Sequence, residues 1–228
     1  IPSFPNITIT NAALIYTSPK DFEIRFKKIQ HPNSTKPTSS FKITTLRGAN
    51  MIDTLTEGAV YAASAGSLNS VAMTAVPNTA GSRAMVIFQI NVSNPISSSA
   101  QLVIDFPNEF SLTDKNPASC SGLGSNTLSS PTCVISSNTL TVSNFVKSVI
   151  NSGESLQLSV DDIQLPATTK PTSTFSIRTM FNGYKVDENN TLIFKTVQAV
   201  ITDRDPLQVL TNPIVGAVST YCISFRNK

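Results

Sequence analysis

Apolar and polar residues alternate with a period of two along most of the chain. In the run 85–92, for example, Val86, Phe88 and Ile90 alternate with Ile87 and Gln89. Alternation over short segments that are separated by Pro, Gly, Asn and Ser is typical of half-buried antiparallel strands. Between residues 66 and 200 it predicts eight strands, which are Val71–Ala75, Met85–Val92, Gln101–Phe106, Cys133–Ile135, Thr139–Val142, Leu156–Val160, Phe175–Met180 and Leu192–Val197. No segment keeps the period of a helix, so the pattern predicts an all-β protein.

The chain contains an internal repeat. Residues 22–46 and 156–180, which lie 134 positions apart, are identical at eleven of twenty-five positions. The shared residues include Thr-Lys-Pro-Thr-Ser, at 35–39 and at 169–173, and the alternating apolar residues that follow it. Such a match indicates a duplicated supersecondary unit.

The two copies stand in unequal surroundings. The second copy ends a long module at residues 66–200, whereas the first has too little chain in front of it to complete a module. The missing part resembles the end of the chain, because Ile223-Ser224-Phe225-Arg226 aligns with Phe88-Gln89-Ile90-Asn91 within a likeness of 209–225 to 71–90. Seven to nine strands with turns at this spacing are typical of an immunoglobulin-like sandwich. We therefore predict tandem immunoglobulin-like antiparallel β-sandwiches, one of them completed across the chain ends by the neighbouring repeat.

The short module is predicted to consist of residues 203–228 and residues 1–65 of the adjacent repeat. Its expected strands are Val209-Leu210, Tyr221–Phe225, Ile7–Thr10, Ala13–Tyr16, Phe22–Phe26, Phe41–Leu46 and Ala59–Tyr61. The expected partners are identical repeats arranged head to tail, in the same chain or in a neighbouring one. A head-to-tail contact of this kind does not close on itself and produces a filament.

Composition narrows the class of protein. Of the 228 residues, 40% are hydrophobic and 14% are charged, the net charge is +3, and about a quarter are Ser or Thr. The basic residues are scattered and are not interleaved with aromatic ones, so we expect no nucleic-acid partner. No apolar run is long enough to cross a membrane, and no signal peptide opens the sequence. Because Ile1 is not an initiator, we expect a processed chain or a piece of a longer one.

The cysteines suggest an oxidising compartment. Cys120 and Cys133 bracket a stretch rich in Gly, Ser and Asn, so a disulfide between them would pin the base of a hairpin or loop. The alternative is a pair of free thiols in a cytosolic protein. The remaining Cys222 fits either a buried free thiol or an intermolecular bridge.

The residues for catalysis or metal binding are sparse. The single histidine, His31, lies where the other copy has Leu165, and no nucleophile signature is present, so we expect no enzyme. Asp203 and Asp205 lie at a module junction, as acidic residues do in calcium-linked repeats, but the opposite junction carries no acid, so a solvated linker is the preferred interpretation. No cofactor other than covalent glycans is expected.

Glycans have several candidate sites. Asn6, Asn33, Asn91 and Asn189 each begin an Asn-x-Ser/Thr sequon, although chance predicts about as many in a chain this rich in Asn, Ser and Thr. Within the two Lys-Pro-Thr-Ser copies, the candidates for O-glycosylation are Thr35, Thr38, Thr169 and Thr172. A plain polar crossover between strands is the alternative explanation of these loops.

Several motifs resemble a known group of proteins. They are the run Phe106-Pro107-Asn108-Glu109-Phe110-Ser111-Leu112, the pair Cys120 and Cys133, the run Asn138-Thr139-Leu140-Thr141-Val142, and the Lys-Pro-Thr-Ser-Thr-Phe loop. Together they resemble the repetitive, Ser/Thr-rich surface proteins of ciliate protists, which are built from tandem immunoglobulin-like modules. The resemblance implies secretion, glycosylation and an extracellular or cell-surface location. We expect a structural repeat unit of an extracellular fibril or surface coat; the alternative is an adhesin that binds a carbohydrate or a surface protein.

Overall fold

The structure is a computed structural model of the 228-residue chain. It describes residues 7–10, 24–29, 31–113 and 117–197, together with the backbone of four short strands between 203 and 226. The chain divides into two compact units, Ile1–His31 and Pro32–Lys228, and every strand described below belongs to the second. The described residues contain no helix, and their sheets are mostly antiparallel, so the prediction of an all-β protein is confirmed. It follows that no described helix is long and apolar enough to cross a membrane.

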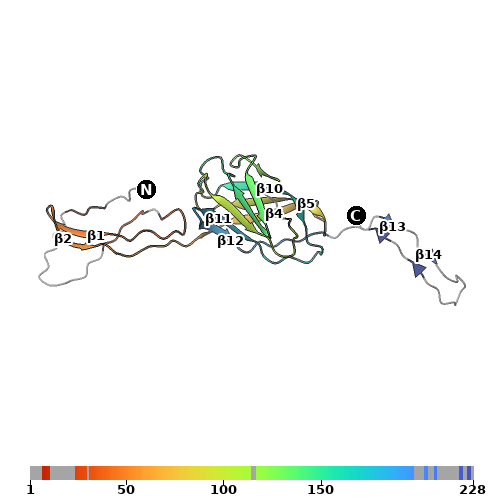
Figure 1. Cartoon of the computed structure of the whole chain (residues 1–228), viewed down its shortest axis with the longest axis horizontal. Helices are drawn as coiled ribbons and strands as arrows, with labels where there is room; N and C mark the ends of the chain where they lie inside the picture. Colours follow the sequence, from red (N-terminus) through yellow and green to blue (C-terminus); the bar gives the residue numbers. More distant parts are fainter. Residues whose placement is uncertain are drawn as a thin grey trace. The chain divides into compact units, whose positions relative to one another are not determined.

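Ten strands between residues 66 and 189 form two sheets (Figure 1). The first sheet is antiparallel and has the order β4 (Ser70–Val76), β5 (Arg83–Asn91), β10 (Ser155–Gln164) and β7 (Cys120–Leu123). The second has the order β3 (Gly66–Ser67), β12 (Tyr184–Asn189), β11 (Ser176–Phe181), β6 (Gln101–Asp105), β9 (Thr139–Ser143) and β8 (Thr132–Ser136). Only β3 and β12 in these two sheets pair in parallel.

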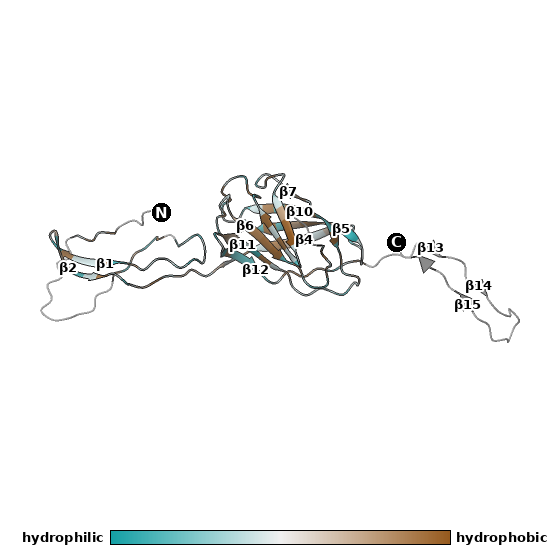
Figure 2. Ribbon diagram, in the orientation of Figure 1, coloured by the Kyte–Doolittle hydropathy of each residue, from teal (hydrophilic) through white to brown (hydrophobic). Residues whose placement is uncertain are grey.

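The two sheets share one hydrophobic core. Val86, Phe88 and Ile90 of β5 are buried together with Leu102 and Ile104 of β6, while the residues between them are partly or fully exposed. This is the alternation that a sheet with one covered face requires. Figure 2 shows the same result, because the hydrophobic residues are concentrated in the strands of the two sheets.

A cluster of aromatic rings fills the centre of this core. Phe175, which is fully buried, has its ring centroid 5.3 Å from those of Phe106 and Phe110 and 6.1 Å from that of Phe88. Phe194 lies against Phe110 at 5.8 Å. The contacts around Phe175 are edge-to-face, which is a favourable geometry for aromatic pairs. Phe175 therefore joins the second sheet to Phe88 in the first.

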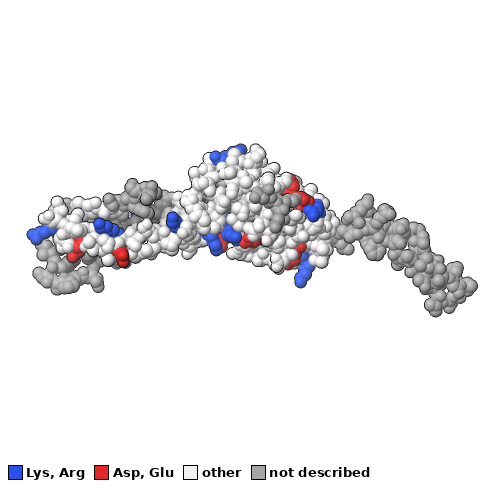
Figure 3. Space-filling view, viewed as in Figure 1, with Lys and Arg blue, Asp and Glu red and all other residues white. Residues whose placement is uncertain are grey.

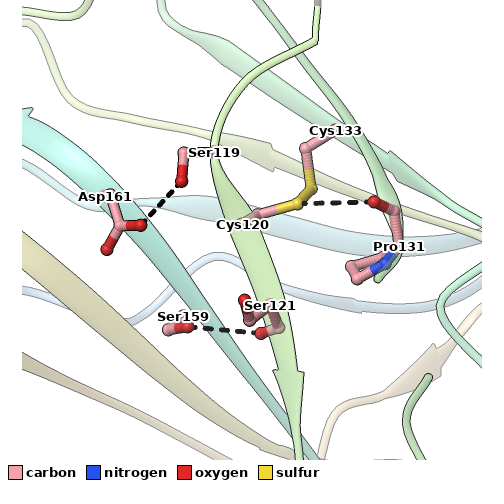
Figure 4. Close-up of a disulfide and its surroundings, with 7 residues drawn as sticks. All are labelled: Ser119, Cys120, Ser121, Pro131, Cys133, Ser159 and Asp161. Atoms are coloured by element: carbon pink, nitrogen blue, oxygen red, sulfur yellow. Dashed lines mark hydrogen bonds between the residues drawn. A yellow bond between two sulfur atoms is a disulfide. The ribbon is translucent and has the colours of Figure 1, made fainter. Parts of the chain in front are cut away.

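The disulfide joins the edges of the two sheets. Cys120 lies on β7 and Cys133 on β8, and the two residues are bonded with their Cα atoms 6.3 Å apart (Figure 4). β7 is an edge strand of the first sheet and β8 of the second. The disulfide predicted from sequence is therefore confirmed, but it bridges the two layers instead of pinning the base of one hairpin or loop.

The opposite side of the sandwich is closed by the chain itself. β3 belongs to the second sheet and β4 to the first, and only Leu68 and Asn69 separate them. The Leu68 N–H donates to the carbonyl of Glu188 in the second sheet, and the Asn69 N–H donates to that of Asn91 in the first. Leu68 is also buried in the core. The two layers are thus held together along both sides.

Most strands of the long module lie where the alternation predicted them, with four differences, the first of which is the unpredicted two-residue strand β3. Residues 192–197 do not form a regular strand, because the Thr172 hydroxyl accepts the Phe194 N–H in place of a ladder carbonyl. Ser121–Leu123, expected to belong to a loop, forms β7 together with Cys120, because these residues pair with β10. β12 was missed because its residues are mainly polar and charged.

The segments predicted for the short module are described in part. β1 (Ile43–Arg47) pairs with β2 (Asn50–Leu55), and the expected strand at 41–46 corresponds to β1. Residues 7–10, 24–26 and 59–61 are not in strands, while Ala13–Tyr16 and residues 22–23 lie outside the described residues. Near the end of the chain, β13 (Asp203–Arg204) pairs with β16 (Phe225–Arg226), and β14 (Gln208–Val209) pairs with β15 (Tyr221–Cys222), both antiparallel.

Glu109 holds the second Lys-Pro-Thr-Ser crossover in place. Its Oε1 accepts the Ser173 N–H at 2.7 Å and the Ser173 hydroxyl at 2.9 Å. These hydrogen bonds favour the charged carboxylate and lower the pKa of Glu109 below its usual value, and the bond from the Ser173 backbone N–H has the largest effect.

The lowered pKa predicts how Glu109 responds to acid. A carboxyl group whose pKa is depressed in the folded state stabilises the fold above its unfolded pKa, and this contribution is lost as the pH falls through the folded pKa. A carbon-detected NMR titration should place the Glu109 midpoint below that of an unperturbed glutamate, and Ser173→Ala should reduce the depression only partly because the backbone donor remains. A midpoint at or above the usual glutamate value would contradict the observed contacts.

The disulfide generates a second prediction. Replacing both Cys120 and Cys133 with alanine should lower the free energy of unfolding by about 3 kcal/mol, because the unfolded chain regains the entropy of an open loop of this length. Urea unfolding of the oxidised chain and the double variant measures the difference, and a reducing agent should leave the double variant unchanged. Equal midpoints for the oxidised chain and the variant would show that the bridge does not secure the two layers.

Candidate interaction site

The β1–β2 hairpin carries apolar side chains that are exposed and that no other described part of the chain buries. Ile43, Leu46, Met51, Ile52 and Leu55 are all between 51% and 61% exposed. An isolated two-stranded hairpin is marginally stable in water, and clustered exposed apolar residues usually mark an interaction surface. We take this hairpin as the candidate site.

The hairpin has the same ladder as β11–β12 in the sandwich. Ile43 pairs with Leu55 and Thr45 with Asp53, and the register shifts between Thr45 and Leu46. Exactly 134 positions later, Ile177 pairs with Asn189 and Thr179 with Asp187, and the register shifts between Thr179 and Met180. In both hairpins the aspartate N–H donates to the threonine Oγ1 at 3.1 Å. The repeat is thus a repeat of backbone geometry as well as of sequence.

The equivalence extends to both sides of the hairpin. The Thr38 N–H donates to the carbonyl of Tyr61 while the Tyr61 N–H donates to the Thr38 hydroxyl, and Thr172 and Phe194 exchange the same two hydrogen bonds. The Phe41 N–H donates to the carbonyl of Ala59, as that of Phe175 does to Leu192. The segments 38–61 and 172–194 are therefore two copies of one structural unit.

A further match lies upstream. Lys28 and Asp162, which are equivalent in the repeat, both have a positive φ, of 61° and 63°. In the sandwich this residue lies in the bulge where β10 shifts register against β5, between Val160 and Ile163. A positive φ is uncommon for residues other than glycine, so its recurrence at this position supports the equivalence of the two copies.

The two copies differ in what covers them. Phe175 and Ile177 are fully buried, whereas their counterparts Phe41 and Ile43 are 55% and 57% exposed. Val186 is buried and its counterpart Ile52 is exposed. Burying an exposed side chain of this size contributes about 1.5–3 kcal/mol. The β1–β2 hairpin thus has the apolar face of a core hairpin, but among the described residues no second sheet packs on that face.

In the sandwich, part of the covering half comes from β5 and the loop that follows it. Phe88 of β5 packs on Phe175. Oδ2 of Asp187 accepts the N–H groups of Ser93 and Asn94 at 3.1 and 3.0 Å, and its Oδ1 accepts the Asn94 side-chain amide at 2.6 Å. Asp187 is fully buried, and Gly66 lies so close that a Cβ there would collide with this group. We call Asp187 the amide-binding carboxylate, because these three N–H groups offset the cost of burying its charge.

Sequence reasoning missed this residue. In the sequence Asp187 stands beside Glu188 with nothing to mark it for burial, and its donors lie more than ninety residues away in the chain. One signal was present: Asn182-Gly183, with φ values of 51° and 80°, is a dipeptide that favours a two-residue hairpin turn. That turn would have located β12, but not the burial of Asp187.

The N-glycosylation candidates lie in different surroundings. Asn33 is exposed, and Asn189 is half-buried with its Oδ1 accepting the N–H groups of Thr191 and Leu192. Asn91 alternates with buried residues but is itself half-buried, and its Oδ1 has no hydrogen-bond partner among the residues that the structure describes. Asn6 lies outside the described residues. Glycosylation at these four sites stays a prediction.

The threonine candidates also differ. Thr169 is exposed and Thr35 is half-buried, with the Thr35 N–H donating to the carbonyl of Lys185. The hydroxyls of Thr38 and Thr172 accept the N–H groups of Tyr61 and Phe194, and Thr172 is buried. The polar crossover role is therefore visible for Thr38 and Thr172, and the solvent-exposed Thr169 is the most accessible candidate for a glycan.

The calcium candidates are not brought into a site that can be described. Asp203 lies in β13, with only its backbone described, and Asp205 lies outside the described residues, as does the side chain of Cys222. Among the described residues no group of three or more His, Cys, Asp or Glu side chains is placed to hold a metal ion. His31 is exposed. On the face drawn in Figure 3, the charged side chains are dispersed among uncharged ones.

Comparison of the sequence with models of known protein families and with curated proteins finds no match.

The two equivalent aspartates allow a matched prediction. Asp187→Ala should lower the free energy of unfolding by about 3 kcal/mol, because it leaves buried N–H groups without an acceptor. Asp53→Ala should change it by less than about 0.5 kcal/mol, because Asp53 is exposed in the single chain. Urea unfolding at low protein concentration measures both. Equal losses from the two variants would contradict the difference in burial.

Proposed function

We propose that this chain is a structural repeat unit of an extracellular, glycosylated fibril or cell-surface coat, and that the repeats assemble head to tail. The observation that carries the proposal is the duplicated hairpin: β11–β12 is covered by a second sheet, while β1–β2 has the same ladder and an uncovered core face. An uncovered copy of a core element fits a module that is completed by another repeat.

The sheet order supports an immunoglobulin-like architecture for the long module. The order β4-β5-β10-β7 corresponds to strands A, B, E and D of that fold, and β12-β11-β6-β9-β8 corresponds to G, F, C, C′ and C″. The chain order departs from that fold between C and E, since β7, at the position of D, precedes β8 and β9, and β8, at the position of C″, precedes β9, at the position of C′. The disulfide also lies between sheet edges and not between strands B and F. We therefore assign the architecture and not the standard connectivity.

The end of the chain supplies a candidate for the missing strands of the short module. Residues 209–225 resemble 71–90 in sequence, and β14 pairs with β15 in antiparallel fashion, as β4 does with β5. We propose that the short module is formed by residues 203–228 of one repeat and residues 1–65 of the next. A repeat that completes its neighbour in this way extends in one direction without closing.

An extracellular location is consistent with the disulfide that joins the two layers, since such bonds persist in oxidising compartments. On secretion by a eukaryote, we expect at least one of the four asparagine sequons to carry a glycan. The resemblance to ciliate surface proteins adds a class of protein in which tandem modules of this kind serve as a coat. The proposal includes no catalytic role.

The proposal predicts concentration-dependent assembly through the core face of β1–β2. In sedimentation velocity the wild-type chain should form species larger than the monomer as its concentration rises, with filaments in negative-stain micrographs. Ile43→Asp places a charge on the core face and should abolish these species. Thr44→Asp, on the opposite face of the same strand, should assemble like the wild type.

Circular dichroism of the two variants checks that the sandwich remains folded. A wild-type chain that stays monomeric at every concentration would refute head-to-tail assembly. Undiminished assembly of Ile43→Asp would refute the hairpin as the site.

A further inference from the structure

We propose that Asp53 is the amide-binding carboxylate of the short module, and that it receives the segment following Phe225 from a second copy of this chain. This inference rests on the proposed head-to-tail assembly and adds which residues meet and what sets their register.

The backbone part of the arrangement already exists in the single chain. The Asp53 N–H donates to Oγ1 of Thr45 at 3.1 Å, the same distance as between Asp187 and Thr179. The register shift that follows the threonine on β11 also follows Thr45 on β1. In β12 this geometry directs the carboxylate toward Ser93 and Asn94. Asp53 is therefore positioned in its own hairpin as Asp187 is.

What Asp53 lacks is the set of amide donors. Among the described residues its carboxylate accepts one hydrogen bond, from the Thr45 hydroxyl at 3.3 Å, and the side chain is exposed. Asp187 accepts three, two of them from consecutive backbone N–H groups. A loop with consecutive free amides, placed directly after a strand, would complete the arrangement at Asp53.

The chain holds one segment whose sequence aligns with this strand and with the first of the two backbone amides that follow it. Because Ile223-Ser224-Phe225-Arg226 aligns with Phe88-Gln89-Ile90-Asn91, Lys228 falls at the position of Ser93. Within this segment, Phe225 and Arg226 form β16 and are paired with β13. Its Ile223 takes the position of Phe88, whose ring packs on Phe175, the counterpart of Phe41. The same alignment thus brings Ile223 to Phe41 and the amide of Lys228 to Asp53.

These two contacts would make assembly specific for one register. Apolar burial alone does not select one register, because a strand shifted by two residues presents the same face again. A carboxylate that is buried without its amide donors is strongly unfavourable. Asp53 would therefore penalise every register except the one that presents the amides after Arg226, which an apolar residue at this position could not do.

The test joins two chains at the predicted contact while leaving Asp53 unchanged. Both chains carry Cys222→Ser; one carries Phe41→Cys and the other Ile223→Cys, and the mixture is treated with a short bismaleimide. The control replaces Phe41→Cys with Lys42→Cys, the adjacent residue on the opposite face. We expect roughly tenfold more cross-linked dimer from the Phe41→Cys mixture, identified by the linked peptide in mass spectrometry.

Asp53→Ala, added to the Phe41→Cys chain, should then lower the cross-linking yield by roughly tenfold, as expected when a charge-assisted hydrogen bond is lost. Thr54→Ala, on the opposite face, should leave the yield unchanged. Equal cross-linking from Phe41→Cys and Lys42→Cys would refute the segment as occupant, and a yield insensitive to Asp53→Ala would refute the role of Asp53. Either result leaves the proposed function standing if Ile43→Asp still abolishes assembly of the wild-type chain, so the two failures are distinguishable.

Discussion

A β-hairpin cannot bury its own core face, because its two strands form a single layer and the face must be covered by a second sheet. In the sandwich the cover of β11–β12 includes Phe88 on β5 and the amides of Ser93 and Asn94 after it. The apolar contact and the polar contact act together, one at Phe175 and one at Asp187. The arrangement of the rest of the module, including the short β3–β4 crossover on one side and the disulfide on the other, keeps the covering sheet in place.

The same need for a covering sheet applies to the β1–β2 hairpin. The β1–β2 hairpin repeats the ladder, the register shift and the Thr–Asp hydrogen bond of the covered hairpin, yet its Phe41 and Ile43 are exposed. A hairpin that had lost its function as a core element would have no reason to keep the aspartate and the threonine opposite each other. Their retention, together with a strand-pair sequence at the far end of the chain, makes completion by a second copy the simplest physical explanation. In the assembly that we propose, the Asp53 carboxylate would set the register between the two copies, and burial of the apolar side chains of β1–β2 would stabilise their contact.

Periodicity in the sequence predicted the strands that have one apolar face, such as β5, β6 and β9, because their buried positions alternate and are occupied by apolar residues. Periodicity missed β12, because Lys185, Asp187 and Glu188 give this strand a polar sequence. The burial of Asp187 depends on donors that are distant in the chain. The sequence repeat located the candidate site, but the three-dimensional structure was needed to show that the core face of β11–β12 is buried and that of β1–β2 is exposed. The disulfide partners were readable from spacing, whereas the two sheet edges that they join were not, because edge positions are a property of topology.

We propose that β1–β2 is covered by residues 203–228 of another copy. This can be tested by hydrogen–deuterium exchange of the same chain under dilute and assembled conditions. The amides of 43–55 and of 221–226 should become protected together on assembly, while those of the sandwich strands exchange at unchanged rates. Assembly that leaves the exchange of 43–55 unaltered, or that protects the sandwich strands in its place, would contradict it.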